Sequence, residues 1–350
     1  MKICIKMYRL CLVVTLVTLF ISCSSNDDGS DSPIPKELIT NVYVVGEKNN
    51  GTSYLPALWK NGEAQYLNDG PNEGYAYSVA VSGDDVYVAG VEYNATNDEA
   101  IFWKNGVAQN LPNESNDASA ASVIVSEDDV YVAGAVHNGT KNVATLWKNG
   151  VAQNLSDGTN QAYANAVVVS GDDVYVVGEE HNGTNPVAKL WKNGVAQPLT
   201  DGSNNTTANA IAVSGSDVYV VGREYIDGNY IAILWKNGVA QPLTDGSNFA
   251  HARSVAVSGS DVYVVGREYI DGNYIAMLWK NGVAQSLTDG SNNAAAYSVT
   301  VIGNDVYVVG HQYNGTTDVA TLWKNGEPQH LDQDLSEGYA YSLFVTQTEE

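Results

Sequence analysis

The chain is 350 residues long, with 44% hydrophobic and 16% charged residues, a composition that indicates a globular protein rather than a disordered one. Its 40 Asp and Glu residues outnumber 17 Lys and Arg residues and give a net charge of −23; so acidic a surface repels phosphate backbones, which excludes nucleic-acid binding. The three cysteines are Cys4, Cys11 and Cys23, so the part that follows them has neither a disulfide nor a thiolate metal site.

Residues 1–22 have the pattern of a signal peptide. A short basic region with Lys2, Lys6 and Arg9 precedes an apolar run from Leu10 to Ile21. That run is shorter than the ~18 residues that a membrane-spanning helix needs, but it suits the hydrophobic region of a signal peptide. The sequence therefore predicts an exported protein.

The end of the apolar run, residues 19–23 (Leu-Phe-Ile-Ser-Cys), resembles a bacterial lipobox. The resemblance implies that Cys23 becomes the lipid-modified N-terminus, carrying palmitate, and that this lipid alone anchors the protein to the outer membrane or the cell surface. Residues 23–40 are then a flexible acidic tether, since residues 24–33 are polar and have nothing to bury. Ordinary secretion and an uncleaved membrane anchor are the alternatives.

Residues 41–350 consist of a repeat of 44 residues. The motif Trp-Lys-Asn-Gly occurs seven times without insertion or deletion, with its tryptophan at Trp59, Trp103, Trp147, Trp191, Trp235, Trp279 and Trp323. One period, starting at residue 261, contains four short strands, residues 262–266, 275–280, 283–287 and 297–302. The Asn-Gly pair predicts a type I′ hairpin turn, with the lysine as a solvated strand end. A period of this length with four strands is typical of a β-propeller blade.

The order of the strands follows from the connections. The longest connection precedes the Ser-Val-x-Val strand, which is therefore expected innermost, at the central channel, with the Ala-Gln-x-Leu strand outermost. The array begins at residues 42–45 without an innermost strand, and residues 337–345 supply the missing one. This permutation predicts an all-β, closed, seven-bladed propeller, because an open stack would carry capping repeats. The repeated tryptophan is expected between blades rather than at a ligand.

The pattern Val-Tyr-Val-x-Gly, Ala-x-Leu-Trp-x-x-Gly and Ala-x-Ser-x-x-Val resembles short extracellular repeats of bacterial proteins, including the HAF type, over roughly residues 42–346. These motifs are structural, so the resemblance implies a propeller and names no activity. The paired motifs of WD40 and kelch blades are missing from the sequence. A lipid anchor joined to a propeller is also similar to the scaffold lipoprotein of the outer-membrane β-barrel assembly machine, which is an analogy of fold.

Candidate ligand contacts lie at the start of the innermost strands, where two positions vary among the repeats. These strand ends share a face with the longer loops, so their side chains are expected to surround the mouth of the channel. Tyrosine has a flat apolar face and a polar tip, which suits sugar rings or peptide. The alternative is that the rings only cover strand ends. The candidates are Tyr75, Tyr77, Tyr163, Asn165, Asn209, His251, Arg253, Tyr297, Tyr339 and Tyr341.

The sequence contains no pattern for a metal, a cofactor or a catalytic site. No loop has the Asp-x-Asp-x-Asp spacing of calcium sites, and one imidazole per blade, as at His137 and His181, makes a poor zinc site. Glu73 and Glu337 are a conceivable acid pair for glycoside cleavage. Both precede copies of the same strand, however, which indicates that they were copied with the repeat. We therefore expect no cofactor and no enzymatic activity.

Together these patterns predict a monomeric, non-catalytic binding module displayed on a lipid anchor at the bacterial envelope, with a glycan or an envelope protein as its ligand. A scaffold subunit of an envelope protein complex is the alternative. A propeller hydrolase or lyase is a third hypothesis.

Overall fold

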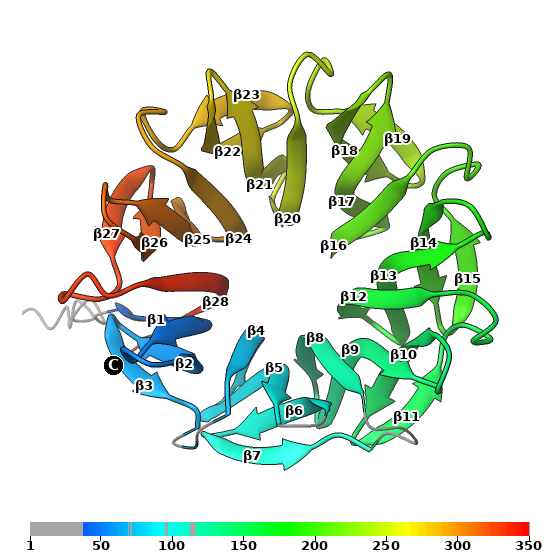
Figure 1. The fold of residues 1–350 in the computed structure, drawn as a ribbon, viewed down its shortest axis with the longest axis horizontal. Helices are drawn as coiled ribbons and strands as arrows, with labels where there is room; N and C mark the ends of the chain where they lie inside the picture. The colour runs from blue at the N-terminus through cyan, green and yellow to red at the C-terminus, as the bar shows by residue number, and fades with distance from the viewer. Residues whose placement is uncertain (1–37, 69, 71, 95–96, 113–116, 350) are drawn as a thin grey trace, which may run out of the picture.

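The computed structural model describes residues 38–68, 70, 72–94, 97–112 and 117–349. The predicted signal peptide and Cys23 lie outside these residues. Within the described ranges every regular element is a β-strand, and no helix there is long and apolar enough to cross a membrane. The strands form seven antiparallel sheets of four strands each, arranged as a ring (Figure 1). This arrangement confirms the predicted seven-bladed propeller.

Each blade has an innermost, a second, a third and an outermost strand, as predicted. The innermost strands are β4 (Gly74–Ser82), β8 (Ala118–Ser126), β12 (Ala162–Ser170), β16 (Thr206–Ser214), β20 (Ala250–Ser258), β24 (Ala294–Ile302) and β28 (Gly338–Glu349). The second strands are β1 (Leu38–Asn49), β5 (Asp85–Tyr93), β9 (Asp129–His137), β13 (Asp173–His181), β17 (Asp217–Ile226), β21 (Asp261–Ile270) and β25 (Asp305–Tyr313). The third strands are β2 (Tyr54–Lys60), β6 (Asp98–Lys104), β10 (Asn142–Lys148), β14 (Pro186–Lys192), β18 (Asn229–Lys236), β22 (Asn273–Lys280) and β26 (Asp318–Lys324). The outermost strands are β3 (Glu63–Tyr66), β7 (Val107–Asn110), β11 (Val151–Asn154), β15 (Val195–Pro198), β19 (Val239–Pro242), β23 (Val283–Ser286) and β27 (Glu327–His330).

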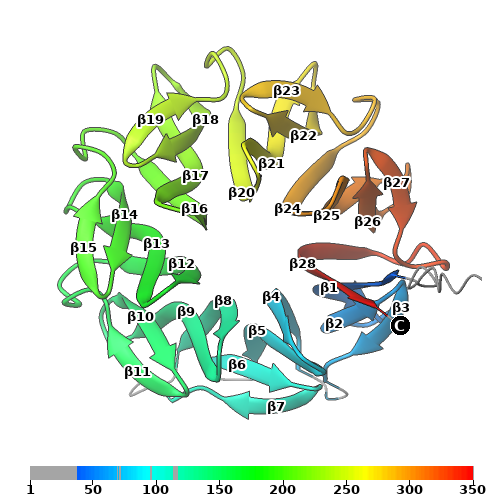
Figure 2. The ribbon, with the colours of Figure 1, turned by 180° about the vertical axis from the view of Figure 1, so that it is seen from behind.

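The last strand closes the ring. β28 pairs with β1 over its whole length, from Leu38 opposite Glu349 to Lys48 opposite Gly338, and completes the sheet β28-β1-β2-β3. Both views show β28 beside β1, at the point where the first and last parts of the chain meet (Figures 1 and 2). The predicted closure by the C-terminal strand is therefore confirmed.

The core lies between the blades and is built around the repeated tryptophan. All seven tryptophans are fully buried. Trp103 on β6, for example, packs against Tyr43, Val45 and Leu67 of the preceding blade. Truncating a buried Trp to Ala typically costs about 3–5 kcal/mol, so these contacts are a main source of stability in a ring without disulfides. The prediction that the tryptophan is inter-blade core is confirmed.

The Lys-Asn-Gly turn joins the third strand of each blade to the outermost one and stabilises that end of the blade. In one copy Asn281 and Gly282 have φ values of 53° and 79°, as a type I′ turn requires. The Asn281 amide donates to Asp261 Oδ1 at 2.8 Å, and Lys280 forms an ion pair with the same aspartate at 2.9 Å. Lys280 also lies over the ring of Tyr263. The lysine is a solvated strand end, as predicted, and it also joins two strands through its ion pair.

Candidate ligand-binding pocket

Every innermost strand carries a β-bulge at the same place. The register between the innermost and second strands shifts by one residue, and the extra residue has no partner opposite it. A bulge changes the direction of the side chain at the inserted residue. The seven bulged residues are Tyr77, Ala121, Asn165, Asn209, Arg253, Tyr297 and Tyr341.

The fixed glycine of the Val-Tyr-Val-x-Gly motif makes room for the bulge. A Cβ placed on Gly90 would clash with the carbonyl oxygen of Tyr75, and one placed on Gly266 would clash with the carbonyl oxygen of His251. The backbone that precedes each bulge therefore presses against the second strand where only hydrogen fits. This contact explains why the glycine recurs in every repeat.

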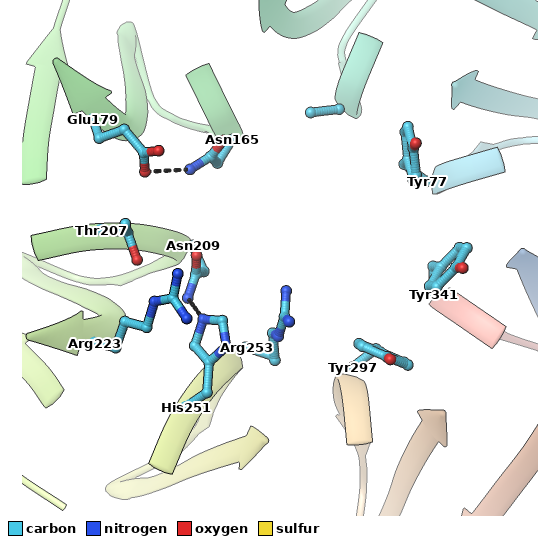
Figure 3. A pocket seen from close by; sticks show the side chains of 11 residues that line it. Tyr77, Asn165, Glu179, Thr207, Asn209, Arg223, His251, Arg253, Tyr297 and Tyr341 are labelled. Atoms are coloured by element: carbon cyan, nitrogen blue, oxygen red, sulfur yellow. Dashed lines mark hydrogen bonds between the residues drawn. The ribbon is translucent and has the colours of Figure 1, made fainter. Parts of the chain in front are cut away.

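The bulged side chains converge on one pocket at the centre of the ring. The pocket has a volume of about 590 Å³, and all seven bulged residues line it together with Glu179, Thr207, Arg223 and His251. Figure 3 shows three tyrosines on one side and the amide, arginine and imidazole groups on the other. The structure thus brings together seven of the ten predicted residues: Tyr77, Asn165, Asn209, His251, Arg253, Tyr297 and Tyr341.

The tyrosine side of the pocket is a continuous aromatic wall. Tyr341 lies between Tyr77 and Tyr297, with ring centroids 5.9 and 5.4 Å away and ring planes inclined by 48° and 73°. Tyr75 stacks on Tyr77 with centroids 5.9 Å apart and planes 2° apart, which extends the wall away from the pocket. Such a wall offers both ring faces and ring edges to a ligand.

Two asparagines on the opposite side link neighbouring blades. Asn165 donates to the backbone carbonyl of Ala208 at 2.9 Å, and Asn209 donates to that of Ala252 at 2.7 Å. Asn165 also lies 3.5 Å from Glu179 Oε2 (Figure 3). Because their NH₂ groups are occupied by the scaffold, these side chains present mainly their oxygen atoms to a ligand.

His251 is a neutral, buried imidazole on the same side of the pocket as these asparagines. It is 4% exposed, and its Nε2 accepts a hydrogen bond from Asn209 Nδ2 at 2.8 Å, which leaves the proton on Nδ1. Burial, reinforced by repulsion from Arg253, Arg223 and Arg267, holds the pKa of His251 well below its usual value. Its Nδ1 has no hydrogen-bond partner among the described residues. The imidazole is therefore a donor rather than a cation.

Two pocket residues come from a position that the sequence analysis did not single out. Glu179 and Arg223 directly follow the fixed glycine of the second strand, and Arg267 occupies the same position one blade later. The sequence does contain a signal, because this position differs among the repeats as widely as the bulge does. This position was not predicted to line the channel because only the innermost strand was expected there, whereas the bulge exposes the second strand behind it.

The other three predicted residues, Tyr75, Tyr163 and Tyr339, lie outside this pocket. Tyr163 Oη accepts hydrogen bonds from Asn142 at 2.9 Å and Gln161 at 2.6 Å. Tyr339 Oη donates to Asp318 Oδ2 at 2.8 Å. Contact of these three tyrosines with a ligand stays a prediction.

Among the described residues there is no group of three or more His, Cys, Asp or Glu side chains placed to hold a metal ion. Glu73 and Glu337, the conceivable acid pair, do not line the pocket. Glu179 is the single carboxylate among the described lining residues, and burial, opposed by the bond from Asn165 and the nearby Arg223, raises its pKa.

No family model matches the sequence, so the likeness of its repeats to the HAF type stays a prediction. Comparison with curated proteins gives no match either. Solved structures do match: the acylaminoacyl peptidase of Pyrococcus horikoshii superposes with a TM-score of 0.52 and 14% identity over 87% of this chain and 52% of the peptidase chain. The chain thus spans about half the length of that enzyme.

Two further similar structures are described as TolB. The protein from Agrobacterium tumefaciens has a TM-score of 0.45 and 8% identity over 89% of this chain and 99% of its own. TolB from Acinetobacter baumannii has a TM-score of 0.47 and 10% identity over 71% of this chain and 64% of its own. At these identities the comparisons show the fold alone.

Proposed function

We propose that this protein is a non-catalytic binding module that displays its propeller at the bacterial envelope and holds a glycan in the central pocket. One observation carries the proposal: the bulged residues, which break the sevenfold repeat, all face the same pocket. The residues that build the blades, by contrast, recur from copy to copy. Variation on a regular scaffold, gathered around one cavity, is the arrangement expected of a binding site.

The composition of the pocket suits sugar rings. The wall of Tyr77, Tyr341 and Tyr297 provides flat apolar faces, while Asn165 and Asn209 provide oxygen acceptors for hydroxyl groups. A volume of about 590 Å³ lies within the usual range for small-molecule sites.

Binding is favoured over catalysis by the state of the titratable groups. Among the described lining residues His251 is neutral and bonded to an amide, and Glu179 stands as a single carboxylate beside Asn165. Hydrolysis needs an acid and a base, or a nucleophile with its activating base, within reach of one another. The pocket offers contacts without such a pair.

The lipid anchor is part of the proposal. Cys23 precedes a polar, acidic segment long enough to separate the propeller from a membrane. Attachment through Cys23 would place the protein on the outer membrane or the cell surface. Mass spectrometry of the mature N-terminus tests this placement, and an unmodified cysteine there would contradict it.

The binding itself is tested on a broad glycan array with the full chain, purified in detergent. We expect a defined set of glycans to bind, and the triple variant Tyr77→Ala, Tyr297→Ala, Tyr341→Ala to lose at least about tenfold in affinity, because aromatic side chains carry much of the energy of such sites. Tyr66→Ala is the control, since Tyr66 is 40% exposed and does not line the pocket. If no glycan binds, the glycan proposal fails and an envelope protein becomes the ligand to seek.

A further inference from the structure

Three of the four arginines in the sequence gather around the pocket. Arg9 lies in the predicted signal peptide, and the other three are Arg223, Arg253 and Arg267. Arg223 and Arg253 line the pocket directly. Arg267 lies close enough to help lower the pKa of both Arg253 and His251. A chain with a net charge of −23 thus concentrates positive charge in one cavity.

One carboxylate, Glu179, lines the pocket near Arg223, but the two form no ion pair in the described residues. Within the described part of the chain none of the three arginines forms an ion pair, whereas the lysine of the Lys-Asn-Gly turn pairs with an aspartate in six blades. The Nε atoms of all three arginines are buried without a hydrogen-bond partner in the described residues. The three side chains are half-buried, so their remaining N–H groups are available to pair with a bound anion.

The guanidinium groups are held in place by aromatic rings instead. Arg223 stacks on Tyr230 at 4.3 Å from the ring centroid, and Arg267 stacks on Tyr274 at 4.1 Å. Arg253 lies 5.5 Å from the centroid of Tyr297, in the aromatic wall. Stacking fixes the plane of a guanidinium group and leaves its N–H edge free for two parallel bonds to the oxygen atoms of a carboxylate or sulfate.

The environment of Arg253 supports the same conclusion. Burial, together with repulsion from Arg267 and Arg223 and against the effect of Tyr297, lowers the pKa of Arg253 to about 10. A negative charge delivered by a ligand would relieve this repulsion. Neutral His251 lines the same pocket and adds no charge to it.

We propose that the ligand of the pocket is an acidic glycan, with a carboxylate or sulfate group bound by Arg223 and Arg253 and its sugar ring packed against Tyr297. This inference rests on the proposed function and specifies the class of its ligand. Arg267 is a positioning residue in this arrangement: it contributes positive potential from the neighbouring blade.

A glycan is favoured over an acidic peptide because backbone groups of the innermost strands are already occupied. The amide of Asn165 bonds to the carbonyl of Ala208, and the hydroxyl of Ser254 accepts from the backbone N–H of Val299 in the next blade. Peptides commonly bind by adding a strand to a free sheet edge. The pocket is lined by the side chains of the bulged residues, which suits recognition of a sugar ring.

The test uses matched probes on the full chain in detergent, with affinities measured by titration calorimetry. Trigalacturonate carries carboxylates, and its methyl ester has the same rings without charge. A sulfated galactan oligosaccharide and its desulfated form separate sulfate from carboxylate as the bound group. We expect one acidic probe to bind at least about tenfold more tightly than its neutral partner, with an affinity that falls as salt rises.

The variants Arg223→Gln and Arg253→Gln are each expected to lose about tenfold or more for the acidic probe. Arg253→Lys keeps the charge but not the parallel N–H donors of the guanidinium group, and it should lose less affinity. Lys141→Gln removes an exposed charge elsewhere and should bind as the wild type does. Equal binding of neutral and acidic glycans would overturn this inference while leaving the proposed function intact. Tighter binding of polyglutamate than of any acidic glycan would also overturn it, and no glycan binding at all would defeat both proposals.

Discussion

Glu47 lies behind the aromatic wall, and its environment differs from that of an ordinary surface glutamate. It is 5% exposed, and Tyr341 Oη donates to its Oε1 at 2.6 Å. Burial raises the pKa of Glu47 to about 7; the Tyr341 bond opposes this shift, while repulsion from Glu337 and Glu73 adds to it. The side of the channel opposite the arginines therefore changes charge near neutral pH, and this change has a thermodynamic consequence.

A carboxyl group whose pKa is higher in the folded than in the unfolded state binds its proton more tightly when folded. Stability should therefore fall as pH rises from the usual value of 4.5 toward about 7. We expect Glu47→Gln, which keeps the shape and the acceptor for Tyr341, to remove this loss. The gain in unfolding free energy relative to the wild type, measured by urea titration, should be on the order of 2 kcal/mol larger at pH 8 than at pH 5, since water in the channel screens part of the full shift.

The control for this measurement is Glu63→Gln, because Glu63 is exposed on the outermost strand β3. Its effect on stability should be small at both pH values. An identical pH profile for wild type and Glu47→Gln would show that Glu47 ionises as an ordinary glutamate does, and the account of its burial would then be incorrect.

At the level of the strand, the sequence predicts the regular part of the blade and misses the irregular part. The Asn-Gly turn, the apolar strands and the constant period determine the number, order and closure of the blades, and the structure agrees. The bulge occurs at the same place in every repeat and leaves the period of 44 residues unchanged, so periodicity alone does not reveal it. The fixed glycine of the Val-Tyr-Val-x-Gly motif was the sequence signal for the bulge, but it was interpreted only as the end of a strand. Consequently the predicted Tyr77, Asn165 and Arg253 line the pocket, but Arg223 and Glu179, which also line it, were not predicted.

The bulge on β20 can be tested through its glycine. Gly266→Ala should destabilise the protein by about 3 kcal/mol, because the added Cβ meets the backbone around His251 and Ala252, which cannot move without shifting the bulge. The control is Gly272→Ala: this turn glycine has open space around it but a φ of 95°, so only backbone strain of about 1 kcal/mol is expected. Urea unfolding compares the two. If both substitutions cost the same, the close approach of the two strands does not constrain the bulge.

At the scale of the whole molecule, ring closure joins the stability of the fold to the geometry of the pocket. Tyr341, at the centre of the aromatic wall, belongs to β28, the strand that closes the ring, while its partners Tyr77 and Tyr297 belong to β4 and β24. The wall therefore exists only when the two ends of the chain are paired. Without that pairing β1 would become an open sheet edge, and an open sheet edge promotes association.

Removal of residues 338–350 should open the ring, because it deletes all of β28 and its pairing with β1. We expect the truncated chain to lose a sharp unfolding transition and to form oligomers on size exclusion, with β1 and the inter-blade core around Trp59 more open to protease. Removal of residues 347–350 alone is the control, since Gln347 and Thr348 are exposed and the main pairing is kept. A synthetic peptide of residues 338–349, added in trans, should restore a monomer with the protease resistance of the intact chain. A truncated chain that stays monomeric and unfolds at the same temperature as the full chain would mean that six complete blades and a three-stranded remnant suffice, and that β28 serves the pocket rather than the fold.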